Sequence, residues 1–425
     1  MTKNNPALQR HSVLPTTASL ADHERLAQQQ LDANAWAYFS GGAADEITLR
    51  ANRSAWDGIT LQPRVLRALA GGHTRTTLLG RTLAHPILLA PIAFQRMAHP
   101  DGELASAYAA AALGAGLVLS TQSSTPLEAV ASAMLGDAGR GPLWFQLYLQ
   151  HDRGFTRQLV QRAEAAGYEA LVLTVDAPTS GARDRERRAG FRLPPGISAV
   201  NLAGLAPPPR AELHPSQSAL FDDLLQHAPT WDDVAWLQSI THLPVLLKGV
   251  LHPDDARQAA ALGVAALIVS NHGGRTLDTA PASAHALPRI ADALQGALPL
   301  LVDGGIRRGT DVLKAIALGA SAVLLGRPAI YGLAHAGAAG VAHVLRLLRD
   351  ELEIAMALTG CTTLAQATSA LLQAPSLLSC AWPPNAAAAK VAPATWSPSA
   401  MPCTVAALRN EAAVACAAPV CGCAS

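Results

Sequence analysis

Cysteine is nearly absent from the part of the sequence that carries recognisable patterns. Of six cysteines in 425 residues, Cys361 stands alone and the other five lie at or beyond Cys380. A disulfide framework for the core is therefore not expected, and a reducing cytoplasm is the predicted compartment. The closing Cys421-Gly422-Cys423 could be a metal or redox pair, but no histidine ligand lies near it, so no metal site is predicted.

Charged and aromatic residues are also scarce, at 15% and 4%, whereas 50% of the residues are apolar. This composition is typical of a globular chain with a large core and not of a disordered one. The net charge is only +1 and no long basic block occurs, so the sequence offers nucleic acid no electrostatic footprint. The N-terminal MTKNNPALQRHSVLP lacks the apolar stretch of a secretory signal.

One uncharged span, residues 104–127, is long enough to suggest a membrane helix. It contains Gly114, Gly116 and a cluster of Ser, Thr and Gln at 120–125. These residues favour a helix, a turn and a strand of a soluble protein, and no membrane span is predicted.

Short apolar runs rich in Val, Ile and Leu are the dominant pattern, and alanine-rich helical stretches such as 156–166, 254–262 and 310–318 separate them. There are eight runs, at 87–90, 117–120, 144–147, 171–175, 245–248, 266–270, 300–303 and 322–326. Continuous apolar strands alternating with helices indicate a covered parallel sheet, and eight units predict an α/β fold of the (β/α)8 TIM-barrel type. The rival is a doubly wound open sheet. It would usually show a glycine fingerprint after the first strand, where Ala90-Pro91-Ile92 stands here.

Two segments depart from this alternation. Residues 189–230 form a proline-rich insertion after the fourth strand, which we expect to be a mobile lid because it leaves from the active rim of the barrel. The tail beyond about residue 380 is rich in Ala and Pro, and is expected to be poorly ordered, with a short helix possible near 405–418. The predicted organisation is thus an N-terminal segment 1–34, a catalytic domain 35–375 and a tail 376–425.

Polar residues end six of the eight runs. In a barrel these ends meet at one rim, where active sites form, and so many converging polar groups exceed what strand capping needs. They are Ser120, Gln146 with Tyr148, Thr174 with Asp176, Lys248, Ser270 with His272, and Asp303 with Gly304 and Gly305.

The stretch SNHGGRTLD at 270–278 carries the sharpest chemistry. A turn needs its glycines, but it needs neither His272 nor Arg275. A guanidinium is suited to hold a carboxylate, and an imidazole beside it can remove a proton near neutral pH. The pair predicts a substrate with a carboxylate next to a carbon or hydroxyl that loses a proton.

The ends of the seventh and eighth runs, Asp303–Arg307 and Gly326-Arg327, predict a phosphate cradle built from backbone N–H groups and two guanidiniums. Lys248 could be a Schiff-base lysine or a fixed cation, and Asp176 could orient His272. Two alternatives follow from these residues. One is a lyase or aldolase barrel that uses Lys248 covalently, and the other is a phosphate-ligand-binding barrel without catalysis.

Seven stretches in matching order resemble the FMN-dependent L-2-hydroxy acid oxidase and dehydrogenase family, which includes glycolate oxidase, lactate oxidase and mandelate dehydrogenase. The resemblance covers about residues 35–370. The stretches are YFSGGAADE (38–46), LLAPIAFQRMAHPDGE (88–103), WFQLY (144–148), LTVDAP (173–178), LLKGV (246–250), SNHGGRTLD (270–278) and VDGGIRRGTDVLKAIALGA (302–320).

The resemblance implies FMN as cofactor and assigns roles. His272 matches the catalytic base, Asp176 its carboxylate partner, and Lys248 the lysine near the flavin N1–C2 carbonyl. Substrate contacts are implied for Tyr38, Tyr148, Arg183 and Arg275. Flavin contacts are implied for Pro91, Ile92, Ala93, Ser120, Gln146, Thr174 and Ser270, and ribityl-phosphate contacts for Asp303, Gly304, Gly305, Arg307, Gly326 and Arg327.

The implied reaction is oxidation of a small L-2-hydroxy acid to the 2-oxo acid. Gln122 stands where glycolate oxidases carry tryptophan, and Ile92 where several relatives carry threonine, so glycolate is not the favoured substrate. Ala93 in place of glycine argues against a lactate monooxygenase outcome.

No haem domain before residue 35 and no membrane-binding insertion are evident, which favours O2 as the electron acceptor. The alternative is a dehydrogenase that passes electrons to a quinone or protein. A homo-oligomer, tetramer or octamer, is also implied.

Overall fold

Eight parallel strands close into a barrel, as the sequence predicts. The computed structural model describes residues 17–209, 212–214 and 216–373. The closed order is β10-β11-β4-β5-β6-β7-β8-β9, in which each strand pairs with its chain neighbour and β11 closes on β4. The strands are β4 (Ile87–Leu89), β5 (Gly116–Leu119), β6 (Leu143–Leu147), β7 (Ala170–Thr174), β8 (Val245–Val250), β9 (Ala266–Val269), β10 (Leu300–Val302) and β11 (Ala322–Leu325).

Alternate residues of each strand face opposite sides of the barrel wall, which is why the runs are apolar throughout. In β4, for example, Leu88 belongs to the cluster that fills the barrel, whereas Ile87 and Leu89 belong to the larger cluster under the helices. The antiparallel hairpin of β2 (Thr76–Leu78) and β3 (Arg81–Leu83) adds Leu78 and Leu83 to the inner cluster. Arg81 of this hairpin pairs with Glu169, directly before β7, and Thr76 donates to the carbonyl of Ser321, directly before β11, so the hairpin packs at the end of the barrel where the strands begin.

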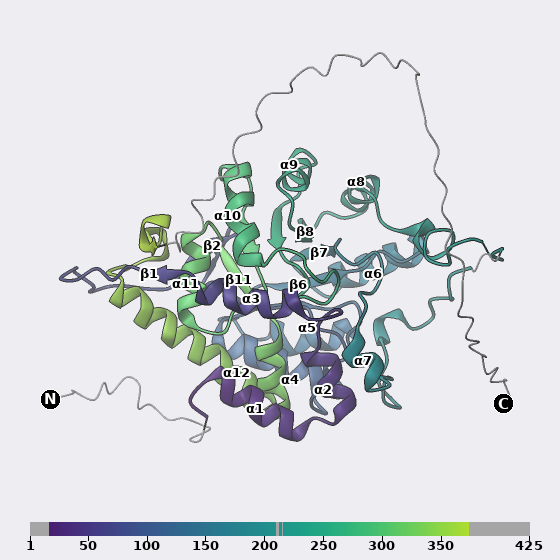
Figure 1. Cartoon of the computed structure of the whole chain (residues 1–425), viewed down its shortest axis with the longest axis horizontal. Coiled ribbons are helices and arrows are strands. Elements are labelled where there is room, and N and C mark those ends of the chain that lie inside the picture. The colour runs from purple at the N-terminus through teal and green to yellow at the C-terminus, as the bar shows by residue number, and fades with distance from the viewer. Residues whose placement is uncertain (1–16, 210–211, 215, 374–425) are drawn as a thin grey trace, which may run out of the picture. The chain divides into compact units, whose positions relative to one another are not determined.

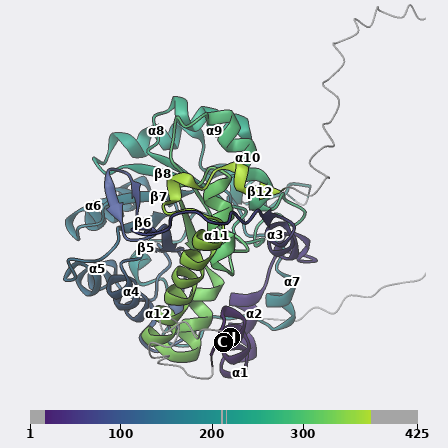
Figure 2. The same cartoon turned by 90° about the vertical axis from the view of Figure 1, so that its left-hand side faces the viewer.

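Helices surround the barrel, with α8, α9 and α10 on one side and α4 and α12 on the opposite side (Figures 1 and 2). The three helical stretches expected from the sequence correspond to α6, α9 and α11. The helices that follow strands are α4 (Gly102–Leu113), α5 (Leu127–Leu135), α6 (Arg153–Ala165), α7 (Asp184–Arg188), α8 (Trp231–Ser239), α9 (Pro253–Ala261), α10 (Ser283–Leu294), α11 (Gly309–Ala317) and α12 (Arg327–Leu358). Short 3-10 turns and a small antiparallel pair complete the described fold: η1 (Gln95–Met97), η2 (Val200–Leu202), η3 (Leu224–His227), η4 (Leu364–Gln366), η5 (Ser369–Leu371), β1 (Thr60–Leu61) and β12 (Leu372–Gln373).

Three helices precede the barrel: α1 (Leu20–Gln30), α2 (Ala33–Ser40) and α3 (Ile47–Asp57). Helix α1 lies within the predicted N-terminal segment 1–34. It packs along α12, and its buried Leu20 belongs to the main core (Figure 2).

The uncharged span 104–127 forms the rest of α4, then β5 and the loop to α5, as expected. Within the described ranges, no helix has both the length and the apolar content needed to cross a bilayer. The tail, with its expected disorder and possible helix, lies outside the described residues.

Candidate active site

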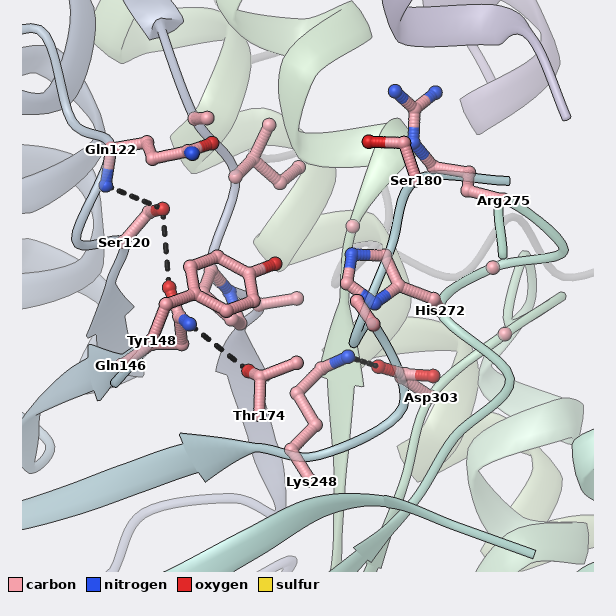
Figure 3. A pocket seen from close by; sticks show the side chains of 18 of the residues that line it. Ser120, Gln122, Gln146, Tyr148, Thr174, Ser180, Lys248, His272, Arg275 and Asp303 are labelled. Atoms are coloured by element: carbon pink, nitrogen blue, oxygen red, sulfur yellow. Dashed lines mark hydrogen bonds and ion pairs between the residues drawn. The ribbon is translucent and has the colours of Figure 1, made fainter. Parts of the chain in front are cut away.

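A cavity of about 840 Å³ opens where the barrel strands end. This volume is in the range of pockets that enclose a cofactor or a drug-sized ligand. All but two of the site residues predicted from the sequence line it, several of which are labelled in Figure 3. The exceptions are Asp176 and Ser270, which form hydrogen bonds with the lining residues His272 and Lys248, respectively. The predicted residues on its wall are Tyr38, Pro91, Ile92, Ala93, Ser120, Gln146, Tyr148, Thr174, Arg183, Lys248, His272, Arg275, Asp303, Gly304, Gly305, Arg307, Gly326 and Arg327.

The turn after β9 places His272 and Arg275 on this wall. His272, Gly273 and Gly274 have successive φ values of +56°, +63° and +73°, in the left-handed region that favours glycine. Close packing demands the glycines as well, because a Cβ on Gly274 would lie 2.7 Å from the backbone nitrogen of Leu49. The stretch is thus both a tight turn and part of a site.

His272 is paired with Asp176, as the sequence suggested. Its Nδ1 donates to Oδ1 of Asp176 at 2.9 Å. Burial lowers the pKa of His272, and the nearby Lys248 lowers it further, against the opposing effect of Asp176. Burial raises the pKa of Asp176, but His272 and Lys248 outweigh it, so that its net pKa is lowered. The carboxylate therefore stays charged, and the imidazole is neutral at neutral pH with Nε2 left for a ligand.

Lys248 is buried at the end of β8 with two polar partners. Its Nζ donates to Oγ of Ser270 at 3.0 Å and lies 3.3 Å from a carboxylate oxygen of Asp303 (Figure 3). Burial lowers the pKa of Lys248, but Asp303 and Asp176 raise it by more, so its pKa lies above the ordinary value. A charged ammonium is a fixed cation. This argues against the covalent lyase or aldolase alternative, which needs a neutral amine.

Three buried polar side chains form a hydrogen-bonded row on the wall opposite His272 (Figure 3). Oγ of Ser120 donates to Oε1 of Gln146 at 3.2 Å, and Nε2 of Gln146 donates to Oγ1 of Thr174 at 3.0 Å. They come from the ends of β5, β6 and β7. Tyr148 follows on the same rim, and burial raises the pKa of its hydroxyl to about 12, so it remains a proton donor.

Arg275 and Arg183 approach the cavity together from two segments. The ring of Tyr38 lies 4.9 Å from the guanidinium carbon of Arg275, a cation–π contact. Arg275 also donates to the backbone carbonyls of Tyr38 and Gly41. Nε of Arg183 is buried and has no hydrogen-bond partner in the described part of the chain, an arrangement that suits an anionic ligand.

The residues expected to hold a phosphate line the same cavity. Gly305 has φ +80°, and a Cβ there would lie 2.2 Å from the backbone oxygen of Asn52, so only glycine fits. Arg307 lies over the ring of Tyr331 and pairs with Glu24 of α1 at 2.8 Å. Arg327 also lines the cavity, and its guanidinium donates to the backbone carbonyls of Phe39, Gly41 and Gly273. It thereby ties the segment after α2 to the His272 turn.

Sequence reasoning missed several residues of the wall. Glu186 lies in the charged run 183–188, from which only Arg183 was chosen, and it contacts both Arg183 and Arg275. Its position three residues after Arg183 is the available signal, because residues three apart share a helix face. The segment 189–230 also contributes lining residues, and no periodicity in the sequence predicts them. Phe191 stacks on Tyr38 with the ring centroids 4.8 Å apart. The others are Leu202, Leu224, Ala228 and Pro229.

Comparison with known proteins decides the family. A family model described as FMN-dependent dehydrogenase matches residues 27–374. The chain belongs to the FMN-dependent dehydrogenase family. It is 50% identical over 355 residues to an L-lactate oxidase of Alicycliphilus denitrificans, with 83% of this chain and 96% of the relative covered. It is 46% identical over 357 residues to glycolate oxidase 1 of Zea mays, with 82% and 94% covered.

Solved structures agree with this family. The structure of mandelate oxidase with benzoyl-formic acid superposes with a TM-score of 0.75 at 43% identity, covering 84% of this chain and 98% of that one. The predicted barrel, family and FMN cofactor are therefore confirmed. The cavity fits FMN in its own right, because it joins a row of amide and hydroxyl groups and a buried lysine to a glycine turn flanked by Arg307. A buried oxygen of Asp303 has no hydrogen-bond partner among the described residues.

Proposed function

We propose that this protein oxidises an L-2-hydroxy acid to the corresponding 2-oxo acid with FMN and that O2 reoxidises the flavin to give H2O2. The observation that carries the proposal is the His272–Asp176 pair at one cavity with two arginines. A base and a carboxylate clamp are the two groups that a 2-hydroxy acid requires. L-lactate is the first candidate substrate, because relatives at 50% identity carry the name L-lactate oxidase.

In this proposal the arginines and Tyr38 orient the substrate. Arg275 and Arg183 bind its carboxylate, and Tyr38 beside Arg275 limits how the carboxylate can rotate. Nε2 of His272 takes the proton that the substrate loses, and Asp176 stabilises the resulting imidazolium. The hydroxyl of Tyr148, protonated because its pKa is raised to about 12, donates a hydrogen bond to the substrate oxygen.

FMN, when bound, accepts the two electrons that leave the substrate carbon. The side chains of Ser120, Gln146 and Thr174, with Pro91, Ile92 and Ala93, would hold its ring system. Lys248, charged and backed by Ser270, would offset negative charge on the ring. Asp303 would hold the ribityl chain, and the phosphate would lie at the cradle of Gly304, Gly305, Arg307, Gly326 and Arg327.

A visible spectrum of the purified protein tests the proposal. The protein should be yellow, and anaerobic L-lactate should bleach it, whereas glycolate should do so less effectively because Gln122 leaves the pocket wider than tryptophan would. L-mandelate and longer-chain hydroxy acids complete the series. A colourless preparation that takes up no added FMN would refute the proposal.

The electron acceptor is tested by stoichiometry in air. The relatives and structures compared above are named oxidases, which supports one H2O2 per 2-oxo acid formed. A ratio near zero would instead assign the protein as a dehydrogenase with a quinone or protein acceptor.

The proposed setting is the cytoplasm, because the described part of the chain has a single cysteine, buried and free. The proposed assembly is a homotetramer, in line with the family resemblance. Analytical ultracentrifugation of the yellow protein measures it directly, and a monomeric sedimentation coefficient would contradict it.

A further inference from the structure

A carboxylate of the chain itself lies on the two arginines of the cavity. Oε1 of Glu186 is 3.1 Å from a terminal nitrogen of Arg275 and 3.4 Å from one of Arg183. The three side chains are only 13%, 14% and 21% exposed, respectively. Charges this poorly screened by solvent interact far more strongly than a surface pair, so Glu186 contributes to the electrostatics of the cavity.

Glu186 does not saturate the arginines. Nε of Arg183 remains buried, with no hydrogen-bond partner in the ranges that the structure describes, and a guanidinium has five N–H donors arranged for two-point contact with carboxylates. The arginine pair can therefore receive a carboxylate other than that of Glu186. Both carboxylates would then compete for the same donors.

The chain around Glu186 is held by contacts on both sides of it. Arg185 of α7 donates to Oγ of Ser40 at 2.9 Å and also pairs with Glu46. Beyond α7, the backbone of Arg192 exchanges two hydrogen bonds with the side chain of Asn34, at 2.8 and 3.0 Å. These contacts hold α7 at the mouth of the cavity, and they keep the charge of Glu186 within a few ångströms of any bound carboxylate.

We infer that Glu186 competes with the substrate's carboxylate for Arg275 and Arg183 and makes the site select 2-hydroxy acids that carry a single carboxylate. The inference deepens the proposed function and rests on it. With Glu186 present the three side chains carry one net positive charge, which one carboxylate neutralises. The site also holds Asp176, Asp303 and the charged Lys248, which together carry one net negative charge, so a second carboxylate on the substrate would meet charge of its own sign and is disfavoured.

Glu186→Gln tests the inference, because it keeps the shape and removes the charge. The apparent KM for L-lactate should fall about tenfold, with a smaller effect on kcat, since a competing charge is lost from a poorly screened site. The kcat/KM for L-malate, a 2-hydroxy acid with two carboxylates, should rise about tenfold more than that for L-lactate. Initial rates of both substrates at constant ionic strength measure this.

Asp184→Asn is the matched control, because it removes a negative charge from the same helix. Asp184 pairs with Arg187 and Arg188, whose side chains are 70% and 78% exposed, and it does not line the cavity. We expect the ratio of the two kcat/KM values to stay at the wild-type level. A change as large as that of Glu186→Gln would show that net charge, not position, matters, and would overturn the inference.

Two further measurements keep the inference open to refutation if Glu186→Gln does not fold. Glu186→Asp, shortened by one methylene, should bridge the arginines less well, so the KM for L-lactate should fall while the preference for L-lactate over L-malate persists. An unchanged or higher KM overturns the inference, and so does a wild-type enzyme that uses L-malate as efficiently as L-lactate. A wild-type enzyme whose flavin no 2-hydroxy acid reduces would refute the proposed function instead.

Discussion

His272 holds a backbone conformation that is rare for a residue with a Cβ. Its φ of +56° is maintained by neighbours: its N–H donates to Oγ of Ser270 at 3.0 Å, and Arg327 donates to the carbonyl of Gly273 at 2.9 Å. Such strain persists only where surrounding contacts impose it, and it is typical of functional sites. The strain here fixes the direction of the imidazole.

His272→Ala should keep FMN but lose reduction of the flavin by substrate. The side chain contributes a base and not a cofactor contact, so the visible spectrum should remain that of bound FMN. The rate of flavin reduction by L-lactate should fall about 10²- to 10⁴-fold, the usual worth of general base catalysis. Anaerobic stopped-flow absorbance measures it, and near-normal bleaching would refute the assigned role.

Asp176→Asn should change the pH dependence of catalysis in a definite direction. The neutral imidazole is the active form, so kcat/KM falls as pH drops through the pKa of His272, which lies below its ordinary value. Asp176 opposes that lowering, and its neutralisation should move the acid limb of the profile to still lower pH. We also expect kcat to fall about 10²-fold, because the imidazolium loses its partner. An acid limb that moves to higher pH would contradict this pairing.

Strand β8 contains an irregularity that serves the site. Its register with β9 shifts between Lys248 and Val250, and Gly249 between them has φ +113°. Bulges of this kind re-aim side chains at the rims of barrels. A Cβ on Gly249 would lie 2.4 Å from Cβ of Asp176. The bulge thus places Lys248 and leaves room for the carboxylate behind His272.

Gly249→Ala should lower both stability and turnover. The positive φ costs about 1–2 kcal/mol for any residue with a Cβ, and the collision with Asp176 should add about 1–3 kcal/mol by displacing it. Thermal unfolding and kcat for L-lactate measure the two effects.

Gly263→Ala separates these two causes. Gly263 also has a positive φ, +71°, but a Cβ there meets nothing within 4 Å. Only the conformational cost of about 1 kcal/mol should remain, with kcat unchanged. If both variants behaved alike, the packing against Asp176 would be irrelevant.

At the scale of the whole barrel, the site exists because strands distant in sequence end at one rim. His272 follows β9, Asp176 follows β7, and Lys248 lies near the end of β8, the strand between them. Residues from the 189–230 segment then cover part of the cavity, among them Phe191 and Leu202. Among its described residues this segment contains only short 3-10 turns, and hydrogen bonds of Arg192 and Asn201 hold its first part, so we expect the part after Asn201 to move as a lid.

Limited proteolysis should find the lid. Phe221 is 66% exposed, so chymotrypsin should cleave there early, cleavage should change the KM for substrate, and a bound 2-oxo acid should slow cleavage. Tyr108 is 56% exposed but lies inside α4. We expect chymotrypsin not to cleave after Tyr108, because a helix does not fit the cleft of a protease. Peptide mapping by mass spectrometry measures both. Equal cleavage at the two sites, or resistance of 189–230, would count against a mobile lid.

Most of the architecture could be predicted because it depends on periodicity. The eight runs match the eight strands within about two residues, since a strand buried on both faces leaves an uninterrupted apolar signature. The polar residues at the strand ends could be predicted equally well. The role of Glu186 could not, because a charged run such as 183–188 is ordinarily solvated. Only the path of α7 over the cavity turns this residue of the run inward.

The sequence by itself determined the barrel, the family and most of the residues that face the cavity, since burial and motif spacing are local properties of the chain. Only the tertiary structure decided which side chains are partners. The hydrogen bonds of Arg327 to backbone carbonyls, the pairing of Arg307 with Glu24, and the contact of Glu186 with Arg275 all join segments far apart in sequence. Hydrogen bonds and ion pairs act over a few ångströms, and no pattern along the chain encodes distances that short.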